Sequence, residues 1–365
     1  MSKIVIDARE YTTSTGRYIF KLIENLQKID NGHGYVLLLK PKDLDVCKLT
    51  NPGFSKVACS YKEFTFFGEQ IGLMQQVRGL KPDLVHFGKD NQPVLYGGKT
   101  VTMMHDLTTA RFRNPAKHRL IFRAKQLVYR LAVKRVARKS AAILTGSEFV
   151  KNDLVNFTHV SPAKIAVTYE AADPITDKPA PLLELENKQF IMYVGRPMPH
   201  KNLERLVGAF KLLRAQRPDL ILVLAGKKDV NYRRIEAAVQ KAGIKNVLFT
   251  DFVAEGQLRW LYENCSAYVF PSLSEGFGLP GLEAMAHGAA VVSSNATCLP
   301  EIYGDAAHYF DPLDVQAMAD AINEVLSNKE LRQSLIEKGR AQVAKYSWRH
   351  MAEQTLAVYE KALNE

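Results

Sequence analysis

Short apolar runs alternate with longer segments of amphipathic helical periodicity along most of the chain. The runs are rich in Val, Ile and Leu, which is typical of parallel strands covered on both faces of a sheet. In the first half they fall at Ile4–Asp7, Tyr35–Leu39, Leu84–Phe87, Val101–His105, Ala141–Thr145 and Ile165–Thr168. In the second half they fall at Phe190–Val194, Leu220–Ala225, Val247–Phe249, Ala267–Phe270, Ala290–Ser293 and His308–Phe310. This alternation predicts an α/β protein with parallel sheets.

The two halves of the chain begin alike, which indicates two Rossmann-like domains. Lys3–Leu26 and Phe190–Leu213 each consist of a predicted strand, a glycine-containing loop and an amphipathic helix. Between the halves, Ala171–Glu186 carries three prolines and little periodicity, as a linker does. We therefore expect one domain at 1–172 and a second at 173–346. The last helix, over 347–365, is expected to cross back onto the first domain.

The composition and the net charge indicate which partners the protein is expected to bind and in which cellular compartment it is expected to lie. The chain has 365 residues, 47% of them hydrophobic, and a formal charge of +11, so phosphates, an anionic membrane or nucleic acid are the expected partners. Four widely spaced cysteines argue against a disulfide framework or a structural zinc site and favour a reducing cytosol. No apolar run approaches the ~18 residues of a membrane span. The N-terminus enters a strand directly, so we expect no signal peptide and a cytoplasmic protein.

The stretch Pro271–Gly288 has the strongest signature of chemistry. A Gly-rich turn follows a strand, Pro280 suits the first turn of the next helix, and Gly288 can end that helix in a left-handed cap. Backbone N–H groups at such a helix start attract an anion. Glu275 and Glu283 flank these backbone N–H groups. Their charges would repel a bare phosphate, but they could accept hydrogen bonds from the hydroxyl groups of a sugar attached to a phosphate. The alternative is an ordinary strand–helix turn with solvated glutamates.

Three further motifs directly follow predicted strands, at the sheet edge where such folds bind ligands. Gly16 precedes a helix predicted from Arg17 to Gln27, His105 ends a strand, and Gly195-Arg196 with Lys201 joins a strand to a helix. The two cations at 196 and 201 could neutralise a leaving diphosphate. Each motif also has a purely structural interpretation. Gly16 could be an ordinary loop glycine, His105 could hydrogen-bond to its neighbour Asp106, and the segment from Gly195 to Lys201 could be a charged surface loop.

A strongly basic segment spans Arg111 to Lys139, with eleven Lys and Arg and no Asp or Glu. Pro115 suits a helix start within it. Its apolar residues form one stripe, made of Leu120, Ala124, Leu127, Val128 and Leu131. The helix could lie on an anionic membrane surface or dock on the sheet through this stripe. Nucleic acid is not expected, since the segment lacks interleaved aromatic residues and a recognised binding motif.

Together these motifs resemble the retaining glycosyltransferases of family 4, over nearly the whole chain. The resemblance lies in Gly16-Arg17-Tyr18, His105-Asp106-Leu107, Gly195-Arg196-x4-Lys201-Asn202, Glu275-Gly276-Phe277-Gly278-Leu279-Pro280-x2-Glu283 and Leu299-Pro300-Glu301-Ile302. It implies the GT-B fold, in which two Rossmann-like domains face a central cleft and the second binds most of a nucleotide sugar. One departure is Ser14, where the family often has a glycine.

The resemblance also implies a role for each matching residue. Arg196 and Lys201 would hold the diphosphate, Glu275 the donor sugar near its reacting carbon, and Glu283 the ribose. The backbone of Gly276, Phe277, Gly278 and Leu279, with Gly195, would cradle phosphate and sugar. His105 would touch the donor sugar, Val253 the base, and Gly16 would close over the diphosphate. The chemistry would be hexose transfer with retention, in which a diphosphate oxygen takes the acceptor proton, with no cofactor and no metal ion.

The donor and acceptor stay open at this point. The Gly16-Arg17-Tyr18 and His105-Asp106-Leu107 motifs resemble those of mannosyltransferases, which favours GDP-mannose, with UDP-glucose and UDP-N-acetylglucosamine as alternatives. The basic segment 111–139 suggests a lipid-linked or polysaccharide acceptor at the inner membrane face. Competing hypotheses are an epimerase, a phosphorylase or a glycosidase, and a non-catalytic protein that binds anionic membranes.

Overall fold

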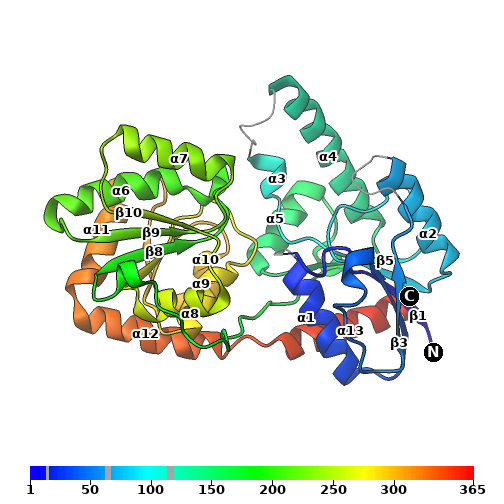
Figure 1. The fold of residues 1–365 in the computed structure, drawn as a ribbon. Helices are drawn as coiled ribbons and strands as arrows, with labels where there is room; N and C mark the ends of the chain where they lie inside the picture. The colour runs from blue at the N-terminus through cyan, green and yellow to red at the C-terminus, as the bar shows by residue number, and fades with distance from the viewer. Residues whose placement is uncertain (14–15, 62–66, 113–118) are drawn as a thin grey trace. The chain divides into compact units, whose positions relative to one another are not determined.

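The computed structural model divides into two compact units, each built on one parallel sheet (Figure 1). It describes residues 1–13, 16–61, 67–112 and 119–365, and only the backbone at 119–124. Unit 1 comprises Met1–Ala110, Arg119–Glu170 and Ser347–Glu365, and unit 2 comprises, of the described residues, Arg111, Phe112 and Ala171–Tyr346. The division between Glu170 and Ala171 lies two residues before the boundary expected from the sequence.

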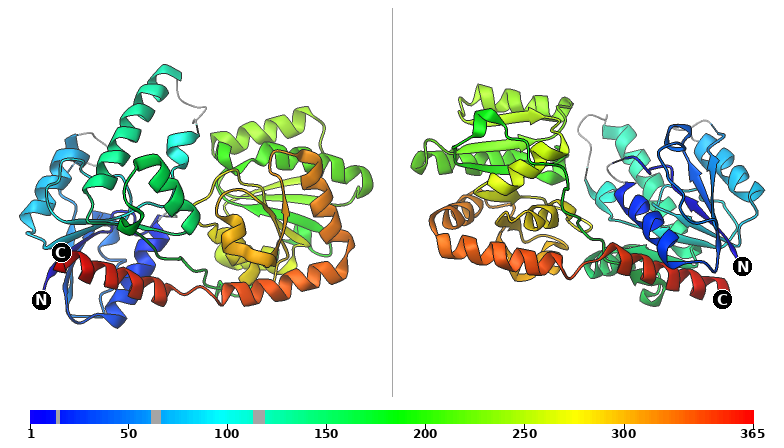
Figure 2. Two further views of the ribbon diagram at one scale, coloured as in Figure 1. Left: turned by 180° about the vertical axis from the view of Figure 1, so that it is seen from behind. Right: turned by 60° about the horizontal axis from the view of Figure 1, so that its bottom comes forward.

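The sheet of unit 1 has the strand order β3-β2-β1-β4-β5-β6-β7, with every pairing parallel. Its strands are β1 (Lys3–Asp7), β2 (Gly34–Leu39), β3 (Phe54–Ala58), β4 (Leu84–Phe87), β5 (Thr100–Met103), β6 (Ala142–Thr145) and β7 (Ile165–Val167). Its helices are α1 (Arg17–Ile29), α2 (Leu73–Gly79), α3 (Thr108–Arg111), α4 (Arg119–Lys139), α5 (Glu148–Thr158) and α13 (Trp348–Asn364). Helices α1 and α13 lie side by side on one face, and α2, α4 and α5 cover the other (Figures 1 and 2).

The sheet of unit 2 has the order β10-β9-β8-β11-β12-β13 and is also parallel. Its strands are β8 (Phe190–Val194), β9 (Ile221–Ala225), β10 (Val247–Asp251), β11 (Ala267–Phe270), β12 (Val291–Ser294) and β13 (Ala307–Phe310). Its helices are α6 (Leu203–Gln216), α7 (Val230–Lys241), α8 (Glu255–Asn264), α9 (Leu279–Ala286), α10 (Leu299–Tyr303), α11 (Val315–Ser327) and α12 (Lys329–Val343). Helices α6, α7 and α11 lie on one face of the sheet, and α8, α9 and α12 on the other (Figure 1).

The predicted strands are all confirmed, with ends that differ by at most two residues. Strand β3 has no counterpart among the predictions. It lies at the sheet edge, where Ser55 and Lys56 are exposed, so its sequence lacks the apolar run of a central strand.

The described side chains of the apolar stripe do not dock on the sheet, and those of Leu120 and Ala124 lie outside the described residues. Leu127, Val128 and Leu131 are 61%, 63% and 60% exposed, which corrects the docking alternative. Helix α4 packs instead through residues nearer its C-terminal end, Val133, Val136 and Ala137, which are buried against α5 and the sheet. Pro115, the expected helix start, lies outside the described residues, and α4 is described from Arg119.

The final helix, α13, packs on α1 in unit 1 and ends at Asn364. Its Tyr359 is fully buried and contacts the Nδ1 atom of His86 on β4 through its hydroxyl, at 2.5 Å. Burial lowers the pKa of His86 to about 3, so the ring is neutral. This contact joins residues 273 positions apart in the chain.

We expect Tyr359→Phe to lower the free energy of unfolding by about 1–3 kcal/mol, because it leaves a buried ring nitrogen of His86 without its partner. Tyr96→Phe is the matched control, since the Tyr96 hydroxyl has no hydrogen-bond partner among the described residues. Urea unfolding followed by circular dichroism measures both variants. Equal effects of the two substitutions would contradict the anchoring role of Tyr359.

Candidate functional site

The turn that follows β11 has the geometry expected from its sequence. Gly278 has a φ of 98°, α9 begins at the next residue with Pro280 in its first turn, and Gly288 has a φ of 76° just beyond the helix. The Tyr303 hydroxyl donates a hydrogen bond to the Gly278 carbonyl at 2.5 Å. The chain thus turns sharply from a buried strand into a helix that starts near the carboxyl edge of the sheet.

The loop after β8 is tied to that turn through Asn202. Asn202 has a φ of 62°, is buried, and donates from its side-chain amide to the carbonyls of Pro271 at 3.0 Å and Pro312 at 2.7 Å. At the start of the same loop, Gly195 has a φ of 143° and accepts a hydrogen bond from the Tyr232 hydroxyl at 2.9 Å. Sequence reasoning gave Asn202 no role, although it stands beside Lys201 in the motif.

Both predicted diphosphate-binding cations are paired with carboxylates. The Nζ atom of Lys201 lies 2.7 Å from Oε1 of Glu275, and both side chains are largely buried, at 19% and 11% exposure. Arg196 instead lies 3.3 Å from Asp229, the residue that caps α7, and is 76% exposed. The structure therefore brings Lys201 and Glu275 together, and it turns the Arg196 side chain toward α7.

The remaining predicted residues of unit 2 lie around the same edge of the sheet. Glu283 on α9 accepts a hydrogen bond from the Tyr262 hydroxyl at 3.4 Å. Gly276, Phe277 and Leu279 form the turn and the start of α9, and the Phe277 ring packs edge-on against Tyr346 with centroids 5.5 Å apart. Val253 is half-buried in the segment after β10.

In unit 1, His105 follows β5 and both ring nitrogens have acceptors. Nδ1 lies 3.3 Å from Oε1 of Glu170, and Nε2 lies 3.3 Å from the Gly88 carbonyl oxygen. Burial opposes a charge on His105, but the hydrogen bond and charge of Glu170, with the nearby Asp106, outweigh it and raise the pKa of the ring. Sequence reasoning missed Glu170, which also follows a strand.

Gly16 precedes α1 with a φ of −85°. A Cβ atom at this position would overlap the Glu10 carbonyl, so the close approach of two backbone segments accounts for glycine here. Ser14, where the family pattern departs, and Thr15 lie outside the described residues.

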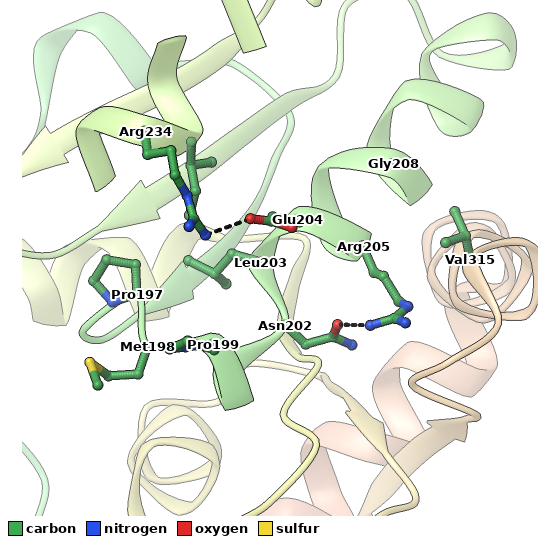
Figure 3. Close-up of a pocket in the computed structure, with 11 residues that line it drawn as sticks. Pro197, Met198, Pro199, Asn202, Leu203, Glu204, Arg205, Gly208, Arg234 and Val315 are labelled. Carbon is green, nitrogen blue, oxygen red and sulfur yellow. Dashed lines mark hydrogen bonds and ion pairs between the residues drawn. The ribbon is translucent and has the colours of Figure 1, made fainter. Parts of the chain in front are cut away.

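Two cavities lie near these residues. In unit 1, a cavity of about 270 Å³ is lined by Asp7, Glu10, Ile19, Gly88, Lys89, Asp90, His105, Asp106, Thr109 and Tyr129. In unit 2, a cavity of about 690 Å³ lies between α6, α7 and the start of α11, lined by residues that include Met198, Asn202, Arg205 and Arg234 (Figure 3). None of the predicted donor-binding residues lines the larger cavity, so its size does not mark the predicted site.

Two units, each built on a parallel Rossmann-like sheet, define a fold of the GT-B class. A solved structure with this fold, sucrose-phosphate synthase from Thermosynechococcus elongatus, is similar with a TM-score of 0.79 and 21% identity, over 99% of each chain. Residues 174–342 match the family described as glycosyl transferases group 1. These similarities support a glycosyltransferase with the GT-B fold.

Curated relatives extend the similarity beyond the second unit. O-antigen chain mannosyltransferase B of Escherichia coli is 28% identical over 376 residues, which cover 95% of this chain and 96% of that protein. MMP alpha-(1->4)-mannosyltransferase of Mycolicibacterium hassiacum is 33% identical over 235 residues, covering 63% of this chain and 56% of that protein.

We expect Gly278→Ala to destabilise unit 2 more than Gly243→Ala does. Both glycines have positive φ, at 98° and 64°, so both substitutions carry backbone strain of about 1–2 kcal/mol. A Cβ atom at Gly278 would also lie 2.6 Å from the Tyr303 hydroxyl, whereas Gly243 has nothing within 4 Å. The crowding should add about 1–3 kcal/mol in urea unfolding. Equal losses would show that the turn relaxes without cost.

Proposed function

We propose that the protein is a retaining glycosyltransferase that moves a hexose from a nucleotide diphosphate sugar to an acceptor hydroxyl. The observation that carries the proposal is the contact of Lys201 with Glu275 beside the Gly278 turn. A cation, a carboxylate and the N-terminus of α9 then meet at one strand end. This is the combination that a sugar diphosphate requires, because it carries anionic oxygens next to neutral hydroxyl groups.

In the proposed mechanism the diphosphate takes the place of Glu275 at Lys201. The released Glu275 then accepts hydrogen bonds from the donor sugar, and Arg196 leaves Asp229 to contact the diphosphate. Glu283 binds the ribose hydroxyls, and Val253 contacts the base. Charge that develops on the leaving diphosphate is then stabilised by Lys201, Arg196 and the N-terminus of α9, and no cofactor or metal ion forms part of the proposal.

We propose GDP-mannose as the donor and a polysaccharide or lipid-linked glycan as the acceptor. The names of the relatives support mannose and glycan synthesis, since one is an O-antigen chain mannosyltransferase. UDP-glucose or UDP-N-acetylglucosamine is the alternative donor. Every donor of this class releases a nucleoside diphosphate as its leaving group. Binding of free nucleoside diphosphates therefore distinguishes a GDP-sugar donor from a UDP-sugar donor.

We expect one diphosphate among GDP, UDP, ADP and dTDP to raise the melting temperature in the presence of chelator. A ligand at 100 times its dissociation constant adds about 2.7 kcal/mol of stability. In Lys201→Ala this shift should vanish, and turnover with the matching nucleotide sugar should fall by about 10²–10³-fold. Lys338→Ala, which removes a surface pair with Asp305 at 3.0 Å, is the control. Normal turnover in folded Lys201→Ala would refute the assignment.

We further propose that the protein acts at the cytoplasmic face of a membrane, with α4 lying on anionic lipid. The support is the exposed group Leu127, Val128 and Leu131, which shares α4 with exposed basic residues at Lys125, Arg135 and Arg138. Helix α4 also extends away from the body of unit 1 (Figure 2). No helix among the described residues is long and apolar enough to span a bilayer. Exposed apolar side chains beside cations suit the boundary between acyl chains and phosphate headgroups.

Replacing Leu127, Val128 and Leu131 together with Asn should abolish co-sedimentation with vesicles of phosphatidylglycerol and phosphatidylcholine at low salt. The apolar contacts are lost while the basic charge is kept. Leu313→Asn is the matched control, since Leu313 is 63% exposed but lies in unit 2. Raising the salt should weaken wild-type binding, because the attraction to anionic lipid is screened. Wild-type protein that stays in the supernatant at low salt would refute membrane binding.

A further inference from the structure

Glu170 is a buried carboxylate at the end of the segment Arg119–Glu170 of unit 1. It is the last residue of unit 1 before the chain enters unit 2, and it is 5% exposed. A buried carboxylate is costly unless a donor or a cation compensates it. The described partner of Glu170 is the Nδ1 atom of His105, at 3.3 Å.

The second ring nitrogen of His105 also faces an acceptor. Nε2 lies 3.3 Å from the Gly88 carbonyl oxygen, just beyond β4. A neutral imidazole has one N–H and one lone pair, so it can donate to one of these two oxygens and must point its lone pair at the other. The doubly protonated ring donates to both. The Tyr18 ring packs edge-on against His105 with centroids 5.4 Å apart, which fixes the plane of the imidazole.

The charges around His105 favour the same protonation state. The groups that face it are Glu170 after β7, Asp106 next to it, Asp90 and neutral His86 from the β4 side, and Tyr18 on α1, with Glu10 and Lys89 across the cavity. Carboxylates outnumber cations in this set. Of these, Glu170 and Asp106, together with the hydrogen bond to the Gly88 carbonyl, raise the pKa of His105 against the effect of burial.

We propose that Glu170 is a positioning residue that keeps His105 doubly protonated, so that His105 acts in the reaction as a fixed cation and not as a proton acceptor. The inference rests on the glycosyl transfer proposed above. The hydrogen bond to Glu170 is the stronger of the two, since its acceptor is charged. A substrate hydroxyl in the unit 1 cavity, which both His105 and Gly88 line, would therefore replace the Gly88 carbonyl at Nε2.

The test is a pH titration of His105 in full-length protein labelled with ¹⁵N-histidine, with His105→Asn used to assign its signals. In Glu170→Gln we expect the titration midpoint to fall by about one pH unit or more, because a neighbouring opposite charge is removed. Since the protonated ring is the active form, kcat is lost as pH rises through the His105 pKa. The alkaline limb of kcat should therefore move to lower pH by the same amount.

Glu324→Gln is the matched control, because it removes the carboxylate that lies 3.0 Å from His308 on the exposed surface of unit 2. It should leave the His105 midpoint and the pH dependence of kcat unchanged. Glu170→Asp keeps the charge at a greater separation, so both quantities should lie between wild type and Glu170→Gln. This variant gives the same test if Glu170→Gln fails to fold.

An unchanged His105 midpoint in the Glu170 variants would overturn the proposal. A lowered His105 midpoint with an unchanged alkaline limb of kcat would also overturn it. Glu170 would then keep His105 protonated, but the charge on His105 would not affect the reaction. Protein that transfers sugar from no donor would refute the proposed function, and the NMR titration would still decide whether Glu170 keeps the ring charged.

Discussion

The side-chain amide of Asn202 is the contact on which the polar loops of unit 2 depend. Its two N–H groups satisfy the carbonyls of Pro271 and Pro312, which lie 69 and 110 residues further along the chain. Three segments that follow β8, β11 and β13 are thereby held at one edge of the sheet. Because the preceding residue is Lys201, the same contact directs the lysine toward Glu275. A residue without two donors at this position would leave a buried carbonyl unpaired.

The three residues that we propose as cations of the site each have a carboxylate partner. Lys201 pairs with Glu275, Arg196 with Asp229, and His105 with Glu170. Such pairing keeps a positive charge stable and oriented while the site holds no anion. In the proposed mechanism, an incoming diphosphate would exchange one anionic partner for another, which costs less than bringing an unpaired charge into the site. Arg196 is the most exposed of the three, so its pair is the easiest to separate.

Much of the fold follows from the sequence because central parallel strands are continuous apolar runs. Edge strand β3 lacks such a run, and its pairing with β2 is settled by tertiary contacts. Periodicity shows that Leu127 and Leu131 share a face of α4 but not what covers that face, so the sequence could not decide between docking on the sheet and exposure. The motifs placed Lys201 and Glu275 just after two predicted strands, and the structure pairs their side chains. The partners of Arg196 and His105 depend on side-chain directions that spacing does not encode.

The return of α13 to unit 1 has a consequence for how the protein is made. Unit 1 is assembled from residues at both ends of the printed sequence, whereas most of unit 2 is the single segment Ala171–Tyr346. During synthesis on the ribosome, unit 2 emerges before Tyr359, which lies 273 residues after its contact His86 in unit 1. The unit translated first is therefore finished last, which reverses the usual N-terminal-first order. Until then, the face of the sheet that α13 covers stays open, so the nascent chain presents an apolar surface for chaperones to protect.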